Sequence, residues 1–198
     1  MKIIGITGVF GSGKSTVTGF LKELGAAVID ADAVVHALYK PEGEGTRQVI
    51  ILFGRGMIVE DGGINRRKLA QAVFTNEEAL KKLNAVIHPL AARQVRTLLE
   101  EHRRRHTKVV ILEAPLLIEA GWKGLVDEVW VTTAPREVIC RRLNRKYGLS
   151  PAEVLARIRQ QLPVSKQLKH ATHAINTDTS LEHLKSKVQR LWQKTARK

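Results

Sequence analysis

The stretch Gly8-Val9-Phe10-Gly11-Ser12-Gly13-Lys14-Ser15 decides how the rest of this 198-residue sequence is interpreted. It matches G-x-x-x-x-G-K-[ST], the phosphate-binding loop, at every fixed position. Apolar-leaning residues 3–7 precede it as an expected strand, and the periodic segment 16–24 follows as an expected helix. A glycine-rich turn before a helix is the structural alternative, but the strand–loop–helix context favours phosphate binding.

This loop supplies the groups that bind a nucleoside triphosphate. Its glycines let the backbone curl so that successive N–H groups converge on one anion. The helix start adds a partial positive charge of about half a unit. Lys14 is expected to reach the β- and γ-phosphates, and the Ser15 hydroxyl is expected to ligate Mg²⁺. The residues expected to bind the nucleotide are Gly8, Gly11, Ser12, Gly13, Lys14, Ser15 and Thr16.

Length and composition indicate an α/β domain with a proper core, since 43% of the 198 residues are hydrophobic. The single cysteine, Cys140, excludes an intrachain disulfide and a cysteine-cluster metal site, and it favours reduced surroundings. Residues 1–5 do not start a signal peptide, and no stretch approaches the roughly 18 apolar residues that a membrane span requires. We therefore expect a soluble, cytoplasmic protein without a membrane partner.

The formal net charge of +14 indicates anionic partners or a basic solvated surface. Only 5% of the residues are aromatic and no basic–aromatic stacking pattern occurs, which weakens a nucleic-acid interpretation. We expect small-molecule substrates and no nucleic acid. The sequence leaves a monomer and a small homo-oligomer equally open.

Carboxylates follow two of the expected strands. Asp30 and Asp32 come after the second strand, and in open α/β sheets ligands bind beyond the carboxyl ends of strands. Asp32 can accept a proton from a substrate hydroxyl and orient its attack on a γ-phosphate, or it can N-cap a helix expected over 33–39. The spacing alone leaves these two interpretations equal. Glu113, after the third strand, is a candidate for the Mg²⁺ shell.

The middle of the chain, residues 41–107, lacks strand–helix alternation and predicts a mostly α-helical insertion. Helical spacing covers 47–53, 66–74 and 77–106, and Pro89 is expected to end or kink the last helix.

Five apolar runs, interleaved with helices, predict a parallel, doubly wound sheet. The runs are 2–7, 26–29, 108–112, 127–131 and 171–175. Residues 135–162 predict a helical hairpin with a basic arm that contains Arg142. This arm is either a solvated face or a lid that neutralises charge on a transferring phosphate, and the phosphate loop favours the lid.

These stretches together resemble the dephospho-CoA kinases, which phosphorylate the ribose 3′-hydroxyl of dephospho-CoA in the last step of coenzyme A synthesis. The order and spacing of the stretches make the resemblance specific, because the phosphate loop alone is generic. It departs from the family pattern at Phe10, Asn65 and Lys146. The stretches that carry it are the phosphate loop, Val28–Asp32, Asp61–Arg66, Ile87-His88-Pro89, Pro115–Glu119, Arg142 before Gly148-Leu149-Ser150, Gln161 and Ile175-Asn176.

The resemblance implies a P-loop kinase fold, with a five-stranded parallel sheet flanked by helices, a mostly α-helical substrate-binding insertion and a helical lid. We expect one domain over 1–198. Its parts are a core at 1–40, 108–134 and 163–198, a CoA- and substrate-binding region at about 41–107, and a lid at about 135–162.

The resemblance also implies a phosphotransferase with an alcohol group as acceptor, using ATP and Mg²⁺. Asp32 matches the catalytic aspartate and would receive the 3′-hydroxyl proton, together with Lys14 and Arg142 in catalysis. Asn176 would meet the adenine. Implied substrate-binding residues are Asp32, Arg66, His88, Pro115, Leu116 and Glu119. A kinase for another small metabolite and an NTP-dependent nucleic-acid-binding module remain as alternatives.

Overall fold

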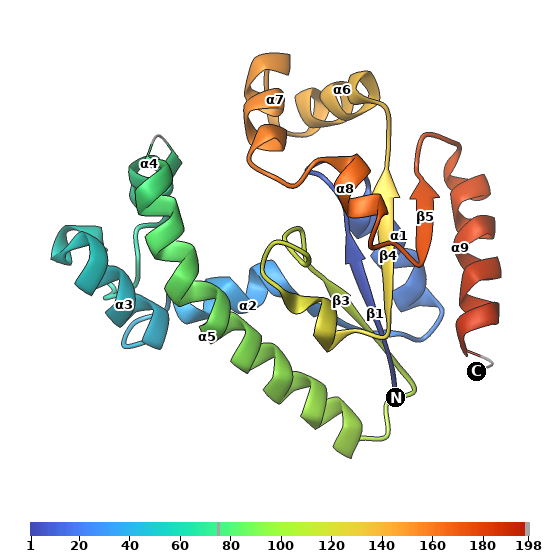
Figure 1. The fold of residues 1–198 in the computed structure, drawn as a ribbon, viewed down its shortest axis with the longest axis horizontal. Helices are drawn as coiled ribbons and strands as arrows, with labels where there is room; N and C mark the ends of the chain where they lie inside the picture. The colour runs from blue at the N-terminus through green and yellow to red at the C-terminus, as the bar shows by residue number, and fades with distance from the viewer. Residues whose placement is uncertain (75, 197–198) are drawn as a thin grey trace. The chain divides into compact units, whose positions relative to one another are not determined.

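The computed structural model describes residues 1–74 and 76–196, and its centre is a five-stranded sheet in the order β2-β3-β1-β4-β5 (Figure 1). Every neighbouring pair of strands is parallel. The expected doubly wound parallel sheet is therefore confirmed, with each strand within two residues of its predicted start and end. The strands are β1 (Lys2–Thr7), β2 (Ala27–Asp30), β3 (Val109–Glu113), β4 (Glu128–Thr133) and β5 (His173–Asn176).

The chain divides into two compact units. We call Met1–Asp30 with Leu99–Lys198 the phosphate-loop unit, because it contains the sheet and residues 8–15. We call Ala31–Leu98 the helical unit.

The helices of the phosphate-loop unit begin and end at the residues that the sequence marks. Ser150 and Glu153 form a reciprocal capping box at one start, and Gly148 ends the preceding helix with a φ of 68°. The short helix α8 was not predicted. The helices are α1 (Lys14–Glu23), η2 (Trp122–Leu125), α6 (Arg136–Tyr147), α7 (Pro151–Arg159), α8 (Val164–Leu168) and α9 (Leu181–Ala196).

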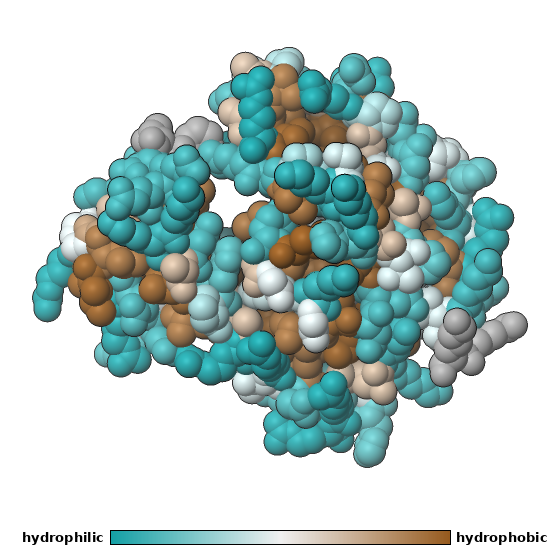
Figure 2. All heavy atoms as spheres, viewed as in Figure 1, coloured by the Kyte–Doolittle hydropathy of each residue, from teal (hydrophilic) through white to brown (hydrophobic). Residues whose placement is uncertain are grey.

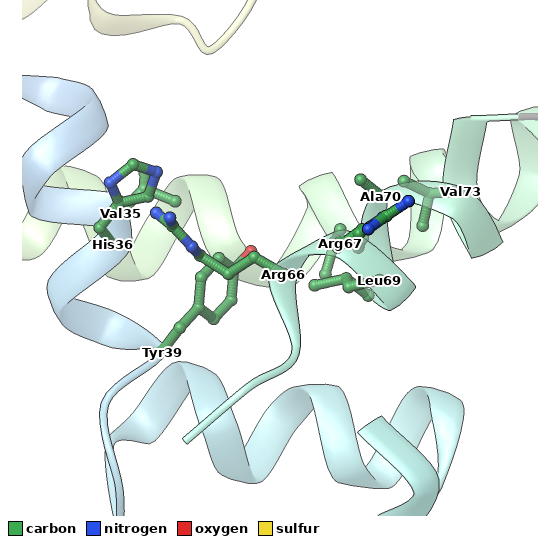
Figure 3. A pocket seen from close by; sticks show the side chains of 9 residues that line it. Val35, His36, Tyr39, Arg66, Arg67, Leu69, Ala70 and Val73 are labelled. Atoms are coloured by element: carbon green, nitrogen blue, oxygen red, sulfur yellow. The ribbon is translucent and has the colours of Figure 1, made fainter. Parts of the chain in front are cut away.

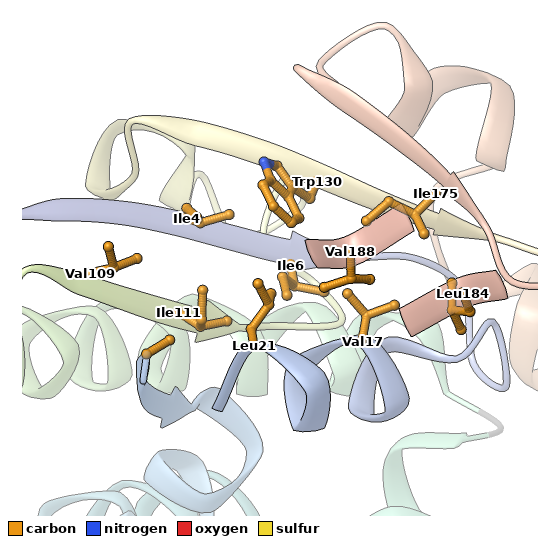
Figure 4. Close-up of a cluster of buried hydrophobic side chains, with 11 residues drawn as sticks. Ile4, Ile6, Val17, Leu21, Val109, Ile111, Trp130, Ile175, Leu184 and Val188 are labelled. Carbon is orange, nitrogen blue, oxygen red and sulfur yellow. The ribbon is translucent and has the colours of Figure 1, made fainter. Parts of the chain in front are cut away.

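The main core of this unit lies between the sheet and the helices α1 and α9 (Figure 4). Val17 and Leu21 from α1 and Val188 from α9 point toward apolar strand residues. Trp130, on β4, has no exposed surface, and its Nε1 donates a hydrogen bond to Glu128 Oε2 at 2.9 Å. A buried indole is thus satisfied, as such groups usually are.

A smaller core joins the α6–α7 hairpin to the phosphate loop. Val9 packs in one cluster with Ile139, Leu143 and Val154, and Phe10 packs against it. The apolar residues of the loop therefore belong to the core of the hairpin that was predicted as a lid.

The helical unit has its own core, which contains Val49, Ile64, Leu69, Leu83 and Ile87. An isolated antiparallel bridge pairs Ile58 with Ile64 in the glycine-rich segment. The helices are α2 (Ala31–Leu38), α3 (Glu44–Phe53), η1 (Arg55–Met57), α4 (Arg66–Phe74) and the start of α5 (Glu77–Arg104).

Pro89 does not end its helix, because α5 continues through it to Arg104. Proline removes one backbone N–H from the helix ladder. The apolar face on both sides of it, including Ile87, Ala91 and Val95, is buried. Burial of that face outweighs one lost hydrogen bond, since tertiary packing supplies most helix stability.

Hydrophilic residues cover most of the face in Figure 2, in keeping with 33 Lys and Arg and 19 Asp and Glu residues in the sequence. Among the described residues, no helix combines the length and the apolar character that a membrane span demands.

Candidate active site

The phosphate loop connects the end of β1 to α1, whose first residue is Lys14. Gly8, Gly11 and Gly13 have φ angles of 146°, 79° and 92°, which L side chains rarely adopt. A Cβ at Gly8 would lie 2.5 Å from the Thr132 carbonyl oxygen. The glycines are therefore required by the backbone, which here forms a concave anion-binding turn at a helix start.

Lys14 spans the loop that it terminates. Its Nζ donates to the carbonyl oxygens of Gly8 at 2.8 Å and Val9 at 3.2 Å. The side chain is only 8% exposed. The ammonium group is thereby held at the loop where phosphates are expected.

Threonines from neighbouring strands support the loop from behind. The hydroxyls of Ser12 and Thr132 share a hydrogen bond of 2.7 Å, and Thr132 Oγ1 donates to the Thr7 carbonyl at 3.2 Å. Thr177 Oγ1 donates to the Ser12 carbonyl at 2.8 Å. These hydroxyls are buried, so the loop is held against β4 and the end of β5.

Oxygen ligands gather at the other end of the loop. The Ser15 hydroxyl donates to Glu113 Oε1 at 2.9 Å, and Glu113 lies in register with Asp30 on the neighbouring strand. Among the described residues, no group of three or more His, Cys, Asp and Glu side chains could hold a metal ion. Ser15 and Glu113 nevertheless fit Mg²⁺, which prefers oxygen ligands and takes few from the protein beside phosphates and water.

Arg142 reaches from α6 to the end of β5. Its Nη1 donates to Thr177 Oγ1 at 2.9 Å, and its Nη2 donates to the Thr177 carbonyl at 2.7 Å. Asn176, the preceding residue, accepts a hydrogen bond from Asp178 N at 2.9 Å in a local turn. The structure thus brings the predicted residues Arg142 and Asn176 to the phosphate loop through Thr177. Sequence reasoning missed Thr177, for which the only signal was its place after a strand.

The Pro115–Glu119 corner lies in the same unit. The Pro115 carbonyl accepts from Thr7 Oγ1 at 3.3 Å, and Leu116 is half-buried. Glu119, predicted to bind substrate, accepts from Leu162 N at 2.8 Å.

Gln161 tethers the segment after α7 to the phosphate loop. It accepts from Phe10 N at 2.7 Å. Gln161 is part of the resemblance but has no role assigned from the sequence; in the structure it binds a loop amide.

Asp32 stands two residues after the end of β2. Helix α2 begins at Ala31, so Asp32 lies within its first turn and the predicted N-cap position before Ala33 is wrong. The helix starts earlier because the chain turns helical directly at the end of the strand. A carboxylate in a first turn is stabilised by the helix dipole.

The helical unit contains a cavity of about 480 Å³ (Figure 3). Arg66 and Arg67, in the first turn of α4, lie on its wall with apolar side chains around them. Neither guanidinium has a hydrogen-bond or ion-pair partner among the described residues. The lining residues are Val35, His36, Tyr39, Arg66, Arg67, Leu69, Ala70, Val73 and Leu83.

Burial raises the pKa of Tyr39, another lining residue, to about 12. Its hydroxyl is protonated and able to donate a hydrogen bond throughout the neutral range, as it would also be at the ordinary pKa of 10.0. His88 is half-buried in α5 and does not line this cavity.

Comparison with known proteins identifies the family. The family model for dephospho-CoA kinase matches residues 2–183. A dephospho-CoA kinase of Dehalococcoides mccartyi is 48% identical over 191 residues, 96% of each chain, and one of Moorella thermoacetica is 41% identical over 198 residues, covering 100% of this chain and 93% of the relative.

Solved structures show the same fold. A crystal structure of a Thermus thermophilus protein, 39% identical, superposes with a TM-score of 0.81 over 98% of this chain and 97% of its own. The dephospho-CoA kinase of Campylobacter jejuni, 23% identical, reaches a TM-score of 0.67 over 100% and 98% of the two chains. The more distant shikimate kinase of Bacteroides thetaiotaomicron, at a TM-score of 0.54, shares the fold. The chain therefore belongs to the dephospho-CoA kinase family.

Proposed function

We propose that this protein transfers the γ-phosphoryl group of ATP to the ribose 3′-hydroxyl of dephospho-CoA, giving coenzyme A and ADP. The observation that carries the proposal is the phosphate loop with Lys14 across it and the Ser15–Glu113 pair at its end, in a chain of this family. The loop accounts for the phosphoryl donor, and family membership accounts for the acceptor.

On the donor side, the loop amides and Lys14 hold the ATP phosphates. Ser15 would ligate Mg²⁺, with Glu113 beside it. An ion held there would supply positive charge against the charge that develops during transfer. Arg142, fixed by Thr177 close to the loop, adds positive charge on the same side. Asn176, next to Thr177, is proposed to meet the adenine.

On the acceptor side, Asp32 receives the proton of the 3′-hydroxyl as that oxygen attacks the γ-phosphorus. A positioned general base of this kind contributes typically about 10²–10⁴-fold to the rate. Ser15 and Asp32 thus act on different reactants. Ser15 acts on the metal-bound phosphates, and Asp32 acts on the hydroxyl nucleophile.

The cavity of the helical unit suits the rest of dephospho-CoA. This substrate joins a diphosphate to a long arm of methylenes and amides. Arg66 and Arg67 offer forked donors that match phosphate oxygens, and Leu69, Val73 and Leu83 offer an apolar wall. His88 and the Pro115, Leu116 and Glu119 corner remain predicted substrate contacts.

A substrate panel tests the proposal. Purified protein is incubated with ATP, Mg²⁺ and either dephospho-CoA, AMP, shikimate or gluconate, and products are identified by mass spectrometry. AMP is the matched control, because it has the adenosine of dephospho-CoA without the diphosphate-linked arm. We expect coenzyme A and ADP from dephospho-CoA alone. Phosphorylation of another alcohol with dephospho-CoA inert would overturn the proposal.

A further inference from the structure

We infer that Thr177 is a positioning residue of the nucleotide site, whose hydroxyl couples the Arg142 guanidinium to the backbone of the phosphate loop. The inference rests on the proposed function only in taking this loop as the place where nucleotide phosphates bind. Thr177 was not among the residues expected from the sequence.

The hydroxyl of Thr177 has both of its hydrogen-bonding capacities in use. Its single proton is shared between the Ser12 carbonyl at 2.8 Å and, less closely, the Thr133 carbonyl at 3.2 Å. Its oxygen accepts from Arg142 Nη1 at 2.9 Å. The side chain is 2% exposed, so water does not replace these partners readily. The hydroxyl therefore has one defined orientation.

That orientation determines where a loop amide points. The carbonyl of Ser12 and the N–H of Gly13 belong to one planar trans peptide and point in opposite directions. In a loop whose N–H groups converge on an anion, the carbonyls face outward and need donors of their own. Lys14 donates to the carbonyls of Gly8 and Val9, and Thr177 donates to that of Ser12. Thr177 thereby holds the Gly13 N–H toward the anion side.

The fit of Thr177 against the loop is close. A Cβ at Gly13 would lie 3.0 Å from Thr177 Oγ1 and 3.1 Å from its Cγ2. Arg142 is fixed to the same residue twice, because Nη2 also donates to the Thr177 carbonyl at 2.7 Å. A guanidinium held by both donors of its planar fork has little freedom to turn. The position of its charge is therefore tied to the shape of the loop.

The test compares Thr177→Val, which keeps the shape and removes the hydroxyl, with Thr177→Ser, which keeps the hydroxyl. ADP affinity is measured by titration calorimetry without any acceptor, and KM for ATP and kcat are measured with dephospho-CoA. We expect Thr177→Val to weaken ADP binding about 10- to 100-fold, as for a buried hydrogen-bond partner removed from a charged group. Thr177→Ser should stay close to wild type. Thr179→Val, an exposed threonine of the same turn without a hydrogen bond among the described residues, is the control and should change nothing.

Coupling to Arg142 is tested by a double-mutant cycle with Arg142→Ala. The loss caused by Arg142→Ala should be smaller in the Thr177→Val background than in wild type, because residues in one network are not additive. Equal losses in both backgrounds would contradict the coupling.

ADP binding by Thr177→Val that equals wild type, or ADP binding by Thr177→Ser as weak as that of Thr177→Val, would overturn the inference. If Thr177→Val does not fold, Thr177→Cys replaces the hydroxyl by a weak donor. Its ADP affinity should then lie below that of Thr177→Ser without being lost. Wild-type ADP affinity in Thr177→Cys would also overturn the inference. A wild-type protein that binds ADP but leaves dephospho-CoA unchanged would instead refute the proposed function.

Discussion

The two units hold their charged groups in opposite ways. In the phosphate-loop unit, Lys14 donates two hydrogen bonds to carbonyl oxygens of the loop, and Arg142 donates two to Thr177. In the helical unit, Arg66 and Arg67 line a cavity without a partner among the described residues. The first arrangement is preorganised, so little reorientation is needed when charge develops. The second keeps its donors available for a ligand that brings the anion with it.

The arginines of the helical unit are also placed against the local field. Arg66 and Arg67 stand in the first turn of α4, where no acidic residue is present. The start of a helix carries partial positive charge, so cations there are mildly unfavourable. An anionic ligand bound beside these arginines would relieve this repulsion, whereas a neutral ligand would not. Three substitutions test the contrast and a fourth tests a partly buried carboxylate of the phosphate-loop unit, beginning with the largest effect.

Asp32→Asn should lower kcat by about 10²–10⁴-fold, because the amide cannot accept the proton of the acceptor hydroxyl. ADP affinity, measured by calorimetry, should remain near wild type, since the loop contacts are untouched. Steady-state turnover with saturating dephospho-CoA measures the first effect. Turnover near wild type would remove Asp32 from the mechanism.

Lys14→Ala should lower kcat/KM for ATP by about 10²–10³-fold, the scale of losing one preorganised donor at a developing charge. ADP binding should weaken as well, because the same ammonium group lies at the loop. Lys22→Ala, an exposed lysine in the last turn of α1, is the matched control. Unchanged kinetics in Lys14→Ala would contradict the interpretation that the Lys14 ammonium is preorganised for phosphate binding.

Arg66→Ala should raise KM for dephospho-CoA by about 10- to 100-fold, the loss of a hydrogen bond to a charged group. Calorimetric ADP affinity should not change if the two units serve different reactants. Arg47→Ala, an exposed arginine on α3 outside the cavity lining, should leave both constants unchanged. If Arg66→Ala weakened ADP binding as strongly as dephospho-CoA binding, the division of labour would be wrong.

Glu128→Gln should lower the stability of the protein slightly at neutral pH, and this loss should disappear at acidic pH. Burial of Glu128 raises its pKa, but hydrogen bonds from Trp130 and Lys2 outweigh burial, so the pKa lies below its ordinary 4.5. A carboxyl whose pKa is lowered in the folded state stabilises the protein at pH values above its ordinary pKa. This stabilisation is lost as the pH falls below that value. The midpoint temperature of thermal unfolding, measured by circular dichroism, should therefore fall less steeply below pH 4.5 in Glu128→Gln than in wild type. We expect a difference in the free energy of unfolding of less than about 1 kcal/mol, since Lys2 is partly exposed to water. Parallel curves of unfolding temperature against pH for the two proteins would refute the lowered pKa of Glu128.

The sheet could be predicted from the sequence because its three central strands, β1, β3 and β4, are buried along almost their whole length. Val109-Val110-Ile111-Leu112 is a continuous apolar run with β-branched residues, which a central parallel strand requires. The caps were also local signals, as at Ser150 and Glu153. The phosphate loop could be recognised from its local sequence alone, because its glycines adopt positive φ angles and the Lys14 side chain donates to carbonyls of the same loop.

Features that depend on distant contacts could not be predicted. Thr177 and Ser12 are 165 residues apart in the sequence, and nothing near Thr177 indicates that its hydroxyl reaches the loop. Pro89 does not end its helix as a local rule allowed, because the apolar face of α5 is buried on both sides of it. Arg66 was assigned through resemblance alone, and only the structure shows it on a cavity wall without a partner among the described residues.

The placement of the tryptophans gives the two units different optical properties. All three tryptophans of the chain, Trp122, Trp130 and Trp192, belong to the phosphate-loop unit, and Trp130 is fully buried beside Glu128. Tryptophan emission during unfolding therefore reports this unit alone, whereas far-ultraviolet circular dichroism reports the helices of both. Coincident transitions would identify one cooperative unit of folding, and separate transitions would identify two. The intrinsic fluorophores thus allow the folding independence of the phosphate-loop unit and the helical unit to be measured without any added label.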